Sequence, residues 1–253
     1  MPTKRRLTRK AWSAYIARLR RQRGKARDDM LDFLVDVESP DRRRVMARAV
    51  RTATRNGAAA AAIACTFYET VAKASGVDIP RAKPVIDVNV GNIAAAVKQG
   101  KRALALGDTD GFANTVASAV AAEVKRCASS TMKGNAERDG AEFAWIPQGD
   151  ETCAFCMTLA GNGWTRAKKS TADGDHADHI HNNCDCEFAI RFSKADNVDG
   201  YDPSYYNQLY NAAPGSTSKD KINSLRRDLY AERKTEINKQ RRERYAAQHP
   251  KDE

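Results

Sequence analysis

Apolar residues near the N-terminus recur at helical spacing. Four of them occupy positions i, i+3, i+4 and i+7: Trp12, Tyr15, Ile16 and Leu19. Most of the neighbouring arginines lie off this stripe, so the pattern predicts an amphipathic basic helix. A second apolar patch over residues 30–37 ends at Pro40, because proline cannot continue a helix. Another helix is expected from about Asp41 to a stop at Gly76.

The middle of the chain continues in helical pattern. Residues 75–84, SGVDIPRAKP, contain two prolines and a glycine and predict a loop. Asn92 is expected to cap a helix that runs to about Leu106. The next helix is expected to reach about Cys127. Its apolar stripe has a spacing of four residues: Phe112, Val116, Val120 and Val124.

The period changes after residue 140. Residues 143–146 and 187–192 are short, apolar and rich in aromatic side chains, and they predict two strands that pair with each other. Between them, Asp150 or Thr152 is expected to cap a helix of about two turns, 153–160, which ends at a pair of glycines.

The C-terminal region is strongly charged. Residues 218–248 have a helical pattern with a thin apolar stripe: Ile222, Leu225, Leu229 and Ile237. Such a helix suits binding to a partner or partial mobility. Four tyrosines precede it at near-helical spacing: Tyr201, Tyr205, Tyr206 and Tyr210. We expect them to dock against the body, with a protein interface as the alternative.

These patterns predict a mainly α fold with a small α+β zinc-bound module. We expect a helical N-terminal body, a short β-hairpin clipped by a metal site and a charged helical C-terminal tail. The expected segments are a basic helical N-terminal region over 1–80, a helical segment over 81–132, a zinc-binding module over 133–195 and a charged helical tail over 196–253.

Length and composition exclude some classes of protein. A chain of 253 residues with 42% hydrophobic content can build a core. No run of about 18 apolar residues is present to span a bilayer, so we expect a soluble protein without a membrane partner. The N-terminus has a basic run with no apolar segment behind it, which argues against export.

The charge is unevenly placed. Residues 1–56 hold 17 Lys and Arg against 6 Asp and Glu, and residues 216–253 hold 11 against 7, whereas residues 57–215 hold 15 against 19. Basic termini attract polyanions, and nucleic acid is the commonest such partner. The alternative is a solvated helix face that keeps the chain soluble.

The greatest chemical information lies in a cluster of spaced cysteines and one histidine, C-x2-C-x24-H-x2-C-x-C. Its members are Cys153, Cys156, His181, Cys184 and Cys186. A C-x-x-C turn can aim two thiolates at one Zn2+, and the second pair of ligands then comes from a distant turn. Disulfides and solitary reduced thiols are the alternatives.

Five donors compete for the four places of a tetrahedral ion. Our expectation is Cys153, Cys156 and His181 with one of Cys184 or Cys186. Because protein would fill every place, the site is expected to be structural and not catalytic. Little apolar area lies between residues 150 and 186, so metal binding would supply folding free energy. The two other cysteines, Cys65 and Cys127, occur in alanine-rich helical patterns and are expected to be small buried residues.

The segments SSTMKGNAERDG, FAWIPQGDETCAFCMTLAGNGW and HNNCDC carry a resemblance. Together they are similar to the minor head proteins of tailed bacteriophages related to the Mu F protein, especially those from phages of actinobacteria. In that family an aromatic strand and a G-D-x-x-C-x-x-C helix precede a variable loop and an H-x-x-C-x-C return. The family's metal-site positions fall on Cys153, Cys156, His181, Cys184 and Cys186.

The resemblance implies a structural protein of the virion head, synthesised in the bacterial host cytoplasm. It would act near the portal, with the portal and other head proteins as partners. The basic termini suit non-specific contact with packaged DNA. Some relatives carry a fused protease or toxin domain, and this chain has no such extension, so no enzymatic activity is expected.

Two other functions stay open. His176 and His179, with Asn182 and Asn183, distantly resemble the metal-finger (HNH) nucleases, in which a histidine base acts beside a divalent cation. The central asparagine and second C-x-x-C of that signature are not met here. The other alternative is a DNA-binding regulator that uses the basic N-terminal helix.

Overall fold

The computed structural model describes residues 9–35, 41–148, 152–168, 180 and 184–248. Its elements in chain order are α1 (Arg9–Leu34), α2 (Arg42–Ser75), α3 (Val90–Ala105), α4 (Thr109–Asp139), β1 (Glu142–Ile146), α5 (Ala154–Gly161), β2 (Thr165–Arg166), β3 (Glu187–Arg191), α7 (Pro203–Ala212) and α8 (Ser218–Gln248). The prediction of a mainly helical fold with a small β element is confirmed.

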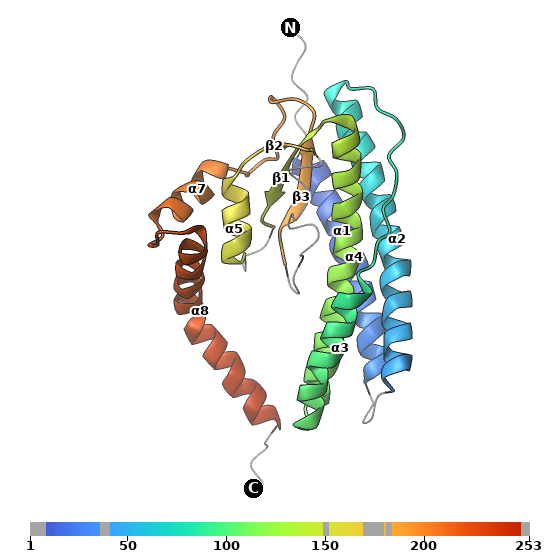
Figure 1. The fold of residues 1–253 in the computed structure, drawn as a ribbon, viewed down its shortest axis with the longest axis vertical. Coiled ribbons are helices and arrows are strands. Elements are labelled where there is room, and N and C mark those ends of the chain that lie inside the picture. Colours follow the sequence, from blue (N-terminus) through green and yellow to red (C-terminus); the bar gives the residue numbers. More distant parts are fainter. Residues whose placement is uncertain (1–8, 36–40, 149–151, 169–179, 181–183, 249–253) are drawn as a thin grey trace.

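The four long helices α1 to α4 form a bundle along the longest axis of the molecule (Figure 1). Helix α4 lies at its centre and packs against α1, α2 and α3. The predicted stripes of α1 and α4 are both buried: Trp12, Tyr15, Ile16, Leu19, Phe112, Val116, Val120 and Val124. The ring of Tyr15 stacks on Phe67 of α2, with 4.1 Å between the ring centroids. The helical period of the sequence therefore identified the core face of both helices.

Capping residues confirm one predicted boundary and correct another. Asp41 caps α2, and Gly76 ends it in the left-handed conformation, with φ of 70°, as predicted. Helix α3 is capped by Asn89 and not by Asn92, because the Asn89 side chain accepts a hydrogen bond from the backbone N–H of Asn92. The Asn92 side chain instead donates to the buried Glu123 of α4 at 2.9 Å.

Helix α4 continues about three turns beyond its predicted end at Cys127, to Asp139. The added turns carry polar residues that are nonetheless buried, and these bind the extended segment before α3. Asn135 accepts a hydrogen bond from the N–H of Lys83 and donates one to its carbonyl, both at 2.9 Å. Thr131 accepts from the N–H of Val85 at 2.9 Å. These contacts are between distant residues, so the periodicity of α4 did not reveal them.

The sheet has three strands in the order β2-β1-β3, all antiparallel. Pairing of β1 with β3 was predicted, and Phe143 lies opposite Ile190 in the register. The short strand β2 corrects the expected two-stranded hairpin. The rings of Phe143 and Phe188 stack at 4.9 Å. Strand β3 contacts α4 and β1 contacts α5, so the sheet lies between the bundle and α5 (Figure 1).

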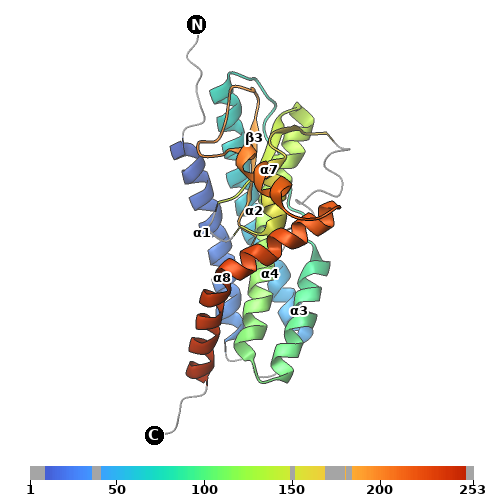
Figure 2. The same ribbon diagram turned by 90° about the vertical axis from the view of Figure 1, so that its left-hand side faces the viewer.

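The C-terminal elements α7 and α8 pack on α5. Leu225 of α8 is buried against Ala154 and Ala213, and Ile222 and Leu229 pack around them, which confirms most of the predicted stripe of α8. The side chain of Ile237 lies outside the described residues. From this contact α8 runs toward the C-terminal end of the chain (Figure 2).

The tyrosine series divides between two environments. Tyr201 is buried and donates its hydroxyl to the carbonyl of Ala160 at 2.7 Å, as the docking prediction expected. Tyr205, in contrast, is largely exposed.

A glycine sets the distance between α2 and α4. A Cβ at Gly57 would lie 2.7 Å from the Sγ of Cys127. Alanine is intrinsically better than glycine in a helix by about 0.5–1 kcal/mol, but this overlap costs about 1–3 kcal/mol. We therefore expect Gly57→Ala to lower the free energy of unfolding by about 1–2 kcal/mol, measured by urea denaturation.

The control is Gly24→Ala on α1, where an added Cβ meets nothing within 4 Å. This variant is expected to be stabilised. Adding Cys127→Ala to Gly57→Ala removes the overlapping sulfur and should recover stability, so the two changes should not be additive. Equal stabilisation by Gly57→Ala and Gly24→Ala would contradict the close contact.

Candidate metal centre

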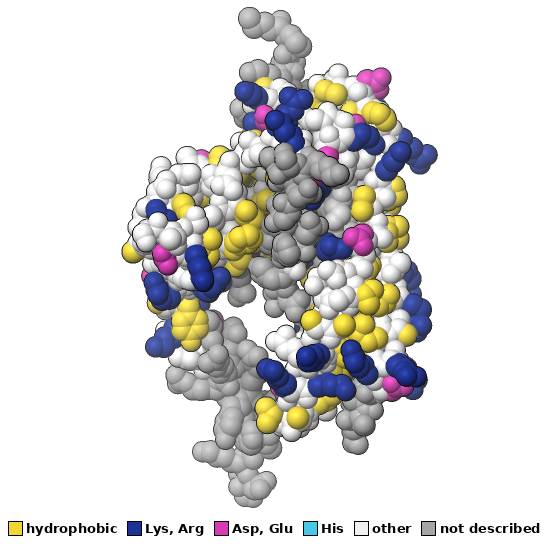
Figure 3. All heavy atoms as spheres, in the orientation of Figure 1, with side chains coloured by type: hydrophobic (Ala, Val, Ile, Leu, Met, Phe, Trp, Pro, Cys, Tyr) yellow, Lys and Arg dark blue, Asp and Glu magenta, His cyan; other side chains and the backbone are white. Residues whose placement is uncertain are grey.

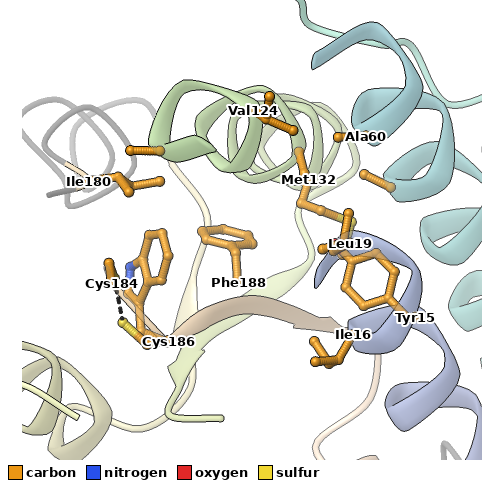
Figure 4. Packing of buried hydrophobic residues seen from close by; sticks show 14 of the residues in the cluster. Tyr15, Ile16, Leu19, Ala60, Val124, Met132, Ile180, Cys184, Cys186 and Phe188 are labelled. Carbon is orange, nitrogen blue, oxygen red and sulfur yellow. Dashed lines mark hydrogen bonds between the residues drawn. The ribbon is translucent and has the colours of Figure 1, made fainter. Parts of the chain in front are cut away.

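Three thiols from two parts of the chain converge beside the sheet. Cys156 lies in α5, whereas Cys184 and Cys186 lie just before β3. Their sulfurs are 3.6 Å apart for Cys156 and Cys184, 3.4 Å for Cys184 and Cys186, and 2.7 Å for Cys156 and Cys186. All three side chains are 2% exposed or less. Figure 4 shows Cys184 and Cys186 together, next to the apolar core around Phe188.

This group could hold a metal ion. A zinc–sulfur bond of about 2.3 Å in tetrahedral geometry separates two sulfurs by about 3.8 Å. Two of the three separations are within about 0.4 Å of that value, and the third would have to widen by about 1 Å. The donor set therefore fits a thiolate-binding ion such as Zn2+ after a small adjustment.

Cys153 has a different position from the other three thiols. It is the N-cap of α5, and its Sγ accepts a hydrogen bond from the backbone N–H of Cys156 at 3.4 Å. It is partly exposed. This corrects the expected cap: Thr152 donates its hydroxyl to Asp185 at 2.8 Å instead, and Asp150 lies outside the described residues.

The structure brings both Cys184 and Cys186 to Cys156, whereas the sequence led us to expect only one of them at the ion. The two cysteines precede β3, which begins at Glu187. They are two residues apart, a spacing that places side chains on the same side of an extended chain, so both can face α5. His181, which was expected as a ligand, lies outside the described residues, as do His176 and His179.

The remaining cysteines differ from each other. None of the six, all of which are described, forms a disulfide in the structure. Cys127 is buried on α4, as predicted, and burial raises its pKa to about 11. Cys65 on α2 is only partly buried, which corrects the expectation of a fully buried residue.

A buried lysine contacts the cysteine cluster, and the sequence did not predict this contact. The side chain of Lys125, from α4, is fully buried. Its Nζ donates to the carbonyl of Cys184 at 3.0 Å, to the carbonyl of Cys186 and to the Sγ of Cys184 at 3.4 Å. The only signal in the sequence is that Lys125 follows an apolar, alanine-rich stretch, between Glu123-Val124 and Arg126.

An ion-pair network continues from Lys125 to α1. Glu187, at the start of β3, lies 3.7 Å from the Lys125 Nζ and 3.1 Å from Arg23. The second terminal nitrogen of Arg23 donates to the carbonyl of Cys184 at 3.1 Å. Helices α1 and α4 therefore both bind the backbone that presents Cys184.

The thiols and the lysine influence each other's protonation. Hydrogen bonds with the three neighbouring thiols, Cys153 first, raise the pKa of Cys156, and burial raises it further. Burial raises the pKa of Cys186 well above its ordinary value. Burial lowers the pKa of Lys125, but Glu187 and the neighbouring sulfurs raise it more, so the net shift is upward. A bound divalent ion reverses this for the sulfurs, because a coordinating thiol loses its proton.

The fold and the cluster define a class: a mainly helical protein with a small sheet, beside which lies a buried three-cysteine group that could hold a metal ion. The family model of the VG15 proteins matches residues 6–213. This is most of the chain, so the chain belongs to the VG15 protein family, a family of viral (phage) proteins. No curated protein and no solved structure matches the chain significantly.

Among the helices that the structure describes, none combines the length and the apolar character that crossing a bilayer requires.

The metal centre can be tested with two serine substitutions. Purified protein is expected to contain about one equivalent of zinc per chain. Cys156→Ser should lose it, because Cys156 is the α5 member of the buried cluster, whereas Cys65→Ser on α2 should keep it. Elemental analysis after dialysis measures the content. Zinc retained by both variants would contradict the assignment.

Charge predicts the fourth ligand. Three thiolates, one divalent ion and Lys125 sum to zero, so a neutral imidazole would leave the centre neutral, whereas a fourth thiolate would give it a net negative charge. We therefore expect His181→Ala to weaken zinc binding more than Cys153→Ser does, measured by competition with a chelator. The reverse order would identify Cys153 as the ligand.

Lys125 gives a further prediction. Lys125→Met keeps the length of the side chain but removes a donor from the carbonyls of Cys184 and Cys186, of which the first keeps Arg23, and leaves Glu187 with one cation fewer. We expect a loss of about 3 kcal/mol in the free energy of unfolding and zinc affinity about tenfold weaker. Lys98→Met, on the exposed face of α3, is the control. Equal stability of the two variants would show that the buried lysine is dispensable.

Proposed function

We propose that this VG15-family chain is a minor head protein of a tailed phage with a structural zinc site, acting at or near the portal in head assembly, DNA packaging or genome delivery. The observation that carries the proposal is the convergence of Cys156, Cys184 and Cys186. Cys156 belongs to one half of the motif that resembles Mu F-like minor head proteins, and Cys184 and Cys186 belong to the other half, which lies far from it in the sequence. Membership of a viral family supports the same context.

A structural role for the ion follows from its surroundings. A catalytic zinc keeps one coordination place open to water, whereas a structural zinc is enclosed by protein. The three sulfurs are buried, and Lys125 and the core around Phe188 lie against them. An ion there would tie α5 to the start of β3, which are separated by a long polar stretch. We propose that the protein has no enzymatic turnover.

The proposed partners are the portal, other head proteins and packaged DNA. Figure 3 shows Lys and Arg side chains gathered over the lower end of the helical bundle. Exposed cations of α2 and α3 include Arg42, Arg43, Arg44, Lys101 and Arg102. With the basic termini, these charges suit sequence-independent contact with DNA. We propose the virion head as the location, after synthesis in the host cytoplasm.

Purified phage particles test this proposal. The chain is expected in particles made by the phage that encodes it, in far fewer copies than the major capsid protein, and it should cross-link to the portal. Quantitative mass spectrometry of particles separated on a density gradient measures both. A chain found in the infected-cell lysate and absent from particles would contradict the proposal.

Nuclease activity is the competing outcome. Incubation of the zinc-loaded protein with plasmid DNA and Mg2+ or Mn2+ is expected to give no cleavage. Metal-dependent cleavage that disappears in His179→Ala would replace the structural proposal with an enzymatic one.

A further inference from the structure

A basic groove runs between α1 and α4 beside the cysteine cluster. Its volume is about 290 Å³. The residues that form its wall come from α1, α4 and the segment before β3: Arg20, Arg23, Gly24, Arg27, Ser118, Ala121, Ala122, Cys184 and Asp185. Small side chains line the α4 side, and three arginines line the α1 side.

The three arginines share one face of α1. They fall at positions i, i+3 and i+7, which places them in a row along the helix. The row from Arg20 to Arg27 spans about 10 Å. A row of this length is longer than a single small anion. It therefore suits a polymeric ligand that carries successive negative charges.

The three arginines of the groove have different partners among the described residues. Arg23 is committed to Glu187 and to the carbonyl of Cys184. In contrast, Arg20 donates to the carbonyl of Gln148 at 2.5 Å, and Arg27 donates to the side-chain oxygen of Asn114 at 2.7 Å. Both of these acceptors are uncharged.

Neither Arg20 nor Arg27 forms an ion pair with any described residue. Among the described residues of the wall, the acidic side chain is that of Asp185, which accepts a hydrogen bond from Thr152. The described part of the wall therefore has an excess of positive charge at both ends of the row.

We propose that this groove binds the phosphodiester backbone of a DNA strand, without regard to sequence. A guanidinium matches phosphate in geometry and can bind it in a bidentate manner. Among the described residues of the α4 side, Ser118 alone offers a polar side chain beside Ala121 and Ala122, and backbone contacts carry no sequence information. The inference deepens the proposed function, on whose DNA partner it rests, and assigns the contact to the body of the protein in addition to the basic termini.

The first test compares two pairs of substitutions on α1. Arg20→Gln/Arg27→Gln removes the two groove arginines that form no ion pair with a described residue. Arg18→Gln/Arg21→Gln removes the same charge from exposed positions of the same helix that do not line it. Binding of the full-length, zinc-loaded protein to fluorescein-labelled oligothymidylate is measured by fluorescence anisotropy at several salt concentrations.

The groove pair is expected to lower the affinity about tenfold and to reduce the salt slope by about 1.4, since each phosphate contact with a single strand contributes about 0.7. The control pair should change both values much less. Equal losses in the two pairs would show diffuse attraction by the whole helix and would overturn the proposal, as would no loss in either.

A second test leaves the arginines in place. Ser118 lies on the opposite wall and is partly exposed. Ser118→Glu adds a negative charge to the groove, and Ser118→Gln adds a side chain of similar size without charge. We expect the glutamate variant alone to weaken binding about tenfold. Equal weakening by both would indicate a steric effect and would contradict phosphate binding.

Competition with other anions distinguishes recognition of a phosphodiester chain from attraction to negative charge in general. Polyglutamate and inorganic phosphate are used as competitors, with duplex DNA as a second labelled ligand. Oligothymidylate should be displaced weakly by either competitor, and polyglutamate that competes equally well would overturn the assignment. If these binding tests fail but the chain is present in particles, only the proposal that the groove binds DNA is rejected. If the groove binds DNA but the chain is absent from particles, only the proposed role in the head is rejected.

Discussion

The arrangement of this protein depends on the hydrogen bonds and the ion pair formed by the buried ammonium group of Lys125. It reaches from the central helix of the bundle to the carbonyls of Cys184 and Cys186 and to Glu187. A buried cation without partners would be costly, so α4, the cysteine-bearing segment and β3 must be assembled together. Arg23 adds α1 to the same network. The sheet is thus joined to the bundle by charge as well as by apolar packing.

Close helix packing makes this reach possible. Gly57 lets α2 approach Cys127, and the alanines of α4 let neighbouring helices lie near its axis. Because α4 is enclosed by three helices and contacts the sheet, its polar residues must find partners within the protein. Asn135 and Thr131 bind the backbone of the segment before α3, and Glu123 binds Asn92. The central helix therefore organises its surroundings through polar contacts on several sides.

The candidate metal centre and the basic groove share residues. Cys184 belongs to both, and Arg23 lies in the groove wall while it donates to the Cys184 carbonyl. A metal that fixes the cysteine-bearing segment would also fix one wall of the groove. The VG15 family places the chain among viral (phage) proteins, and in that context the proposed ion and the proposed DNA-binding groove are compatible with one role.

The sequence by itself determined the helical stripes of α1 and α4, the two ends of α2, the pairing of β1 with β3 and the presence of a clustered set of metal-binding residue types. These depend on local periodicity, on turn residues and on spacing along the chain. Only the tertiary structure decided that Cys184 and Cys186 both meet Cys156, that α4 continues to Asp139, and that Lys125 and Arg23 support the cluster. Each of these outcomes rests on contacts between residues distant in the chain, and a lysine or asparagine in a helix has the same local pattern whether solvent or a buried carbonyl is its partner.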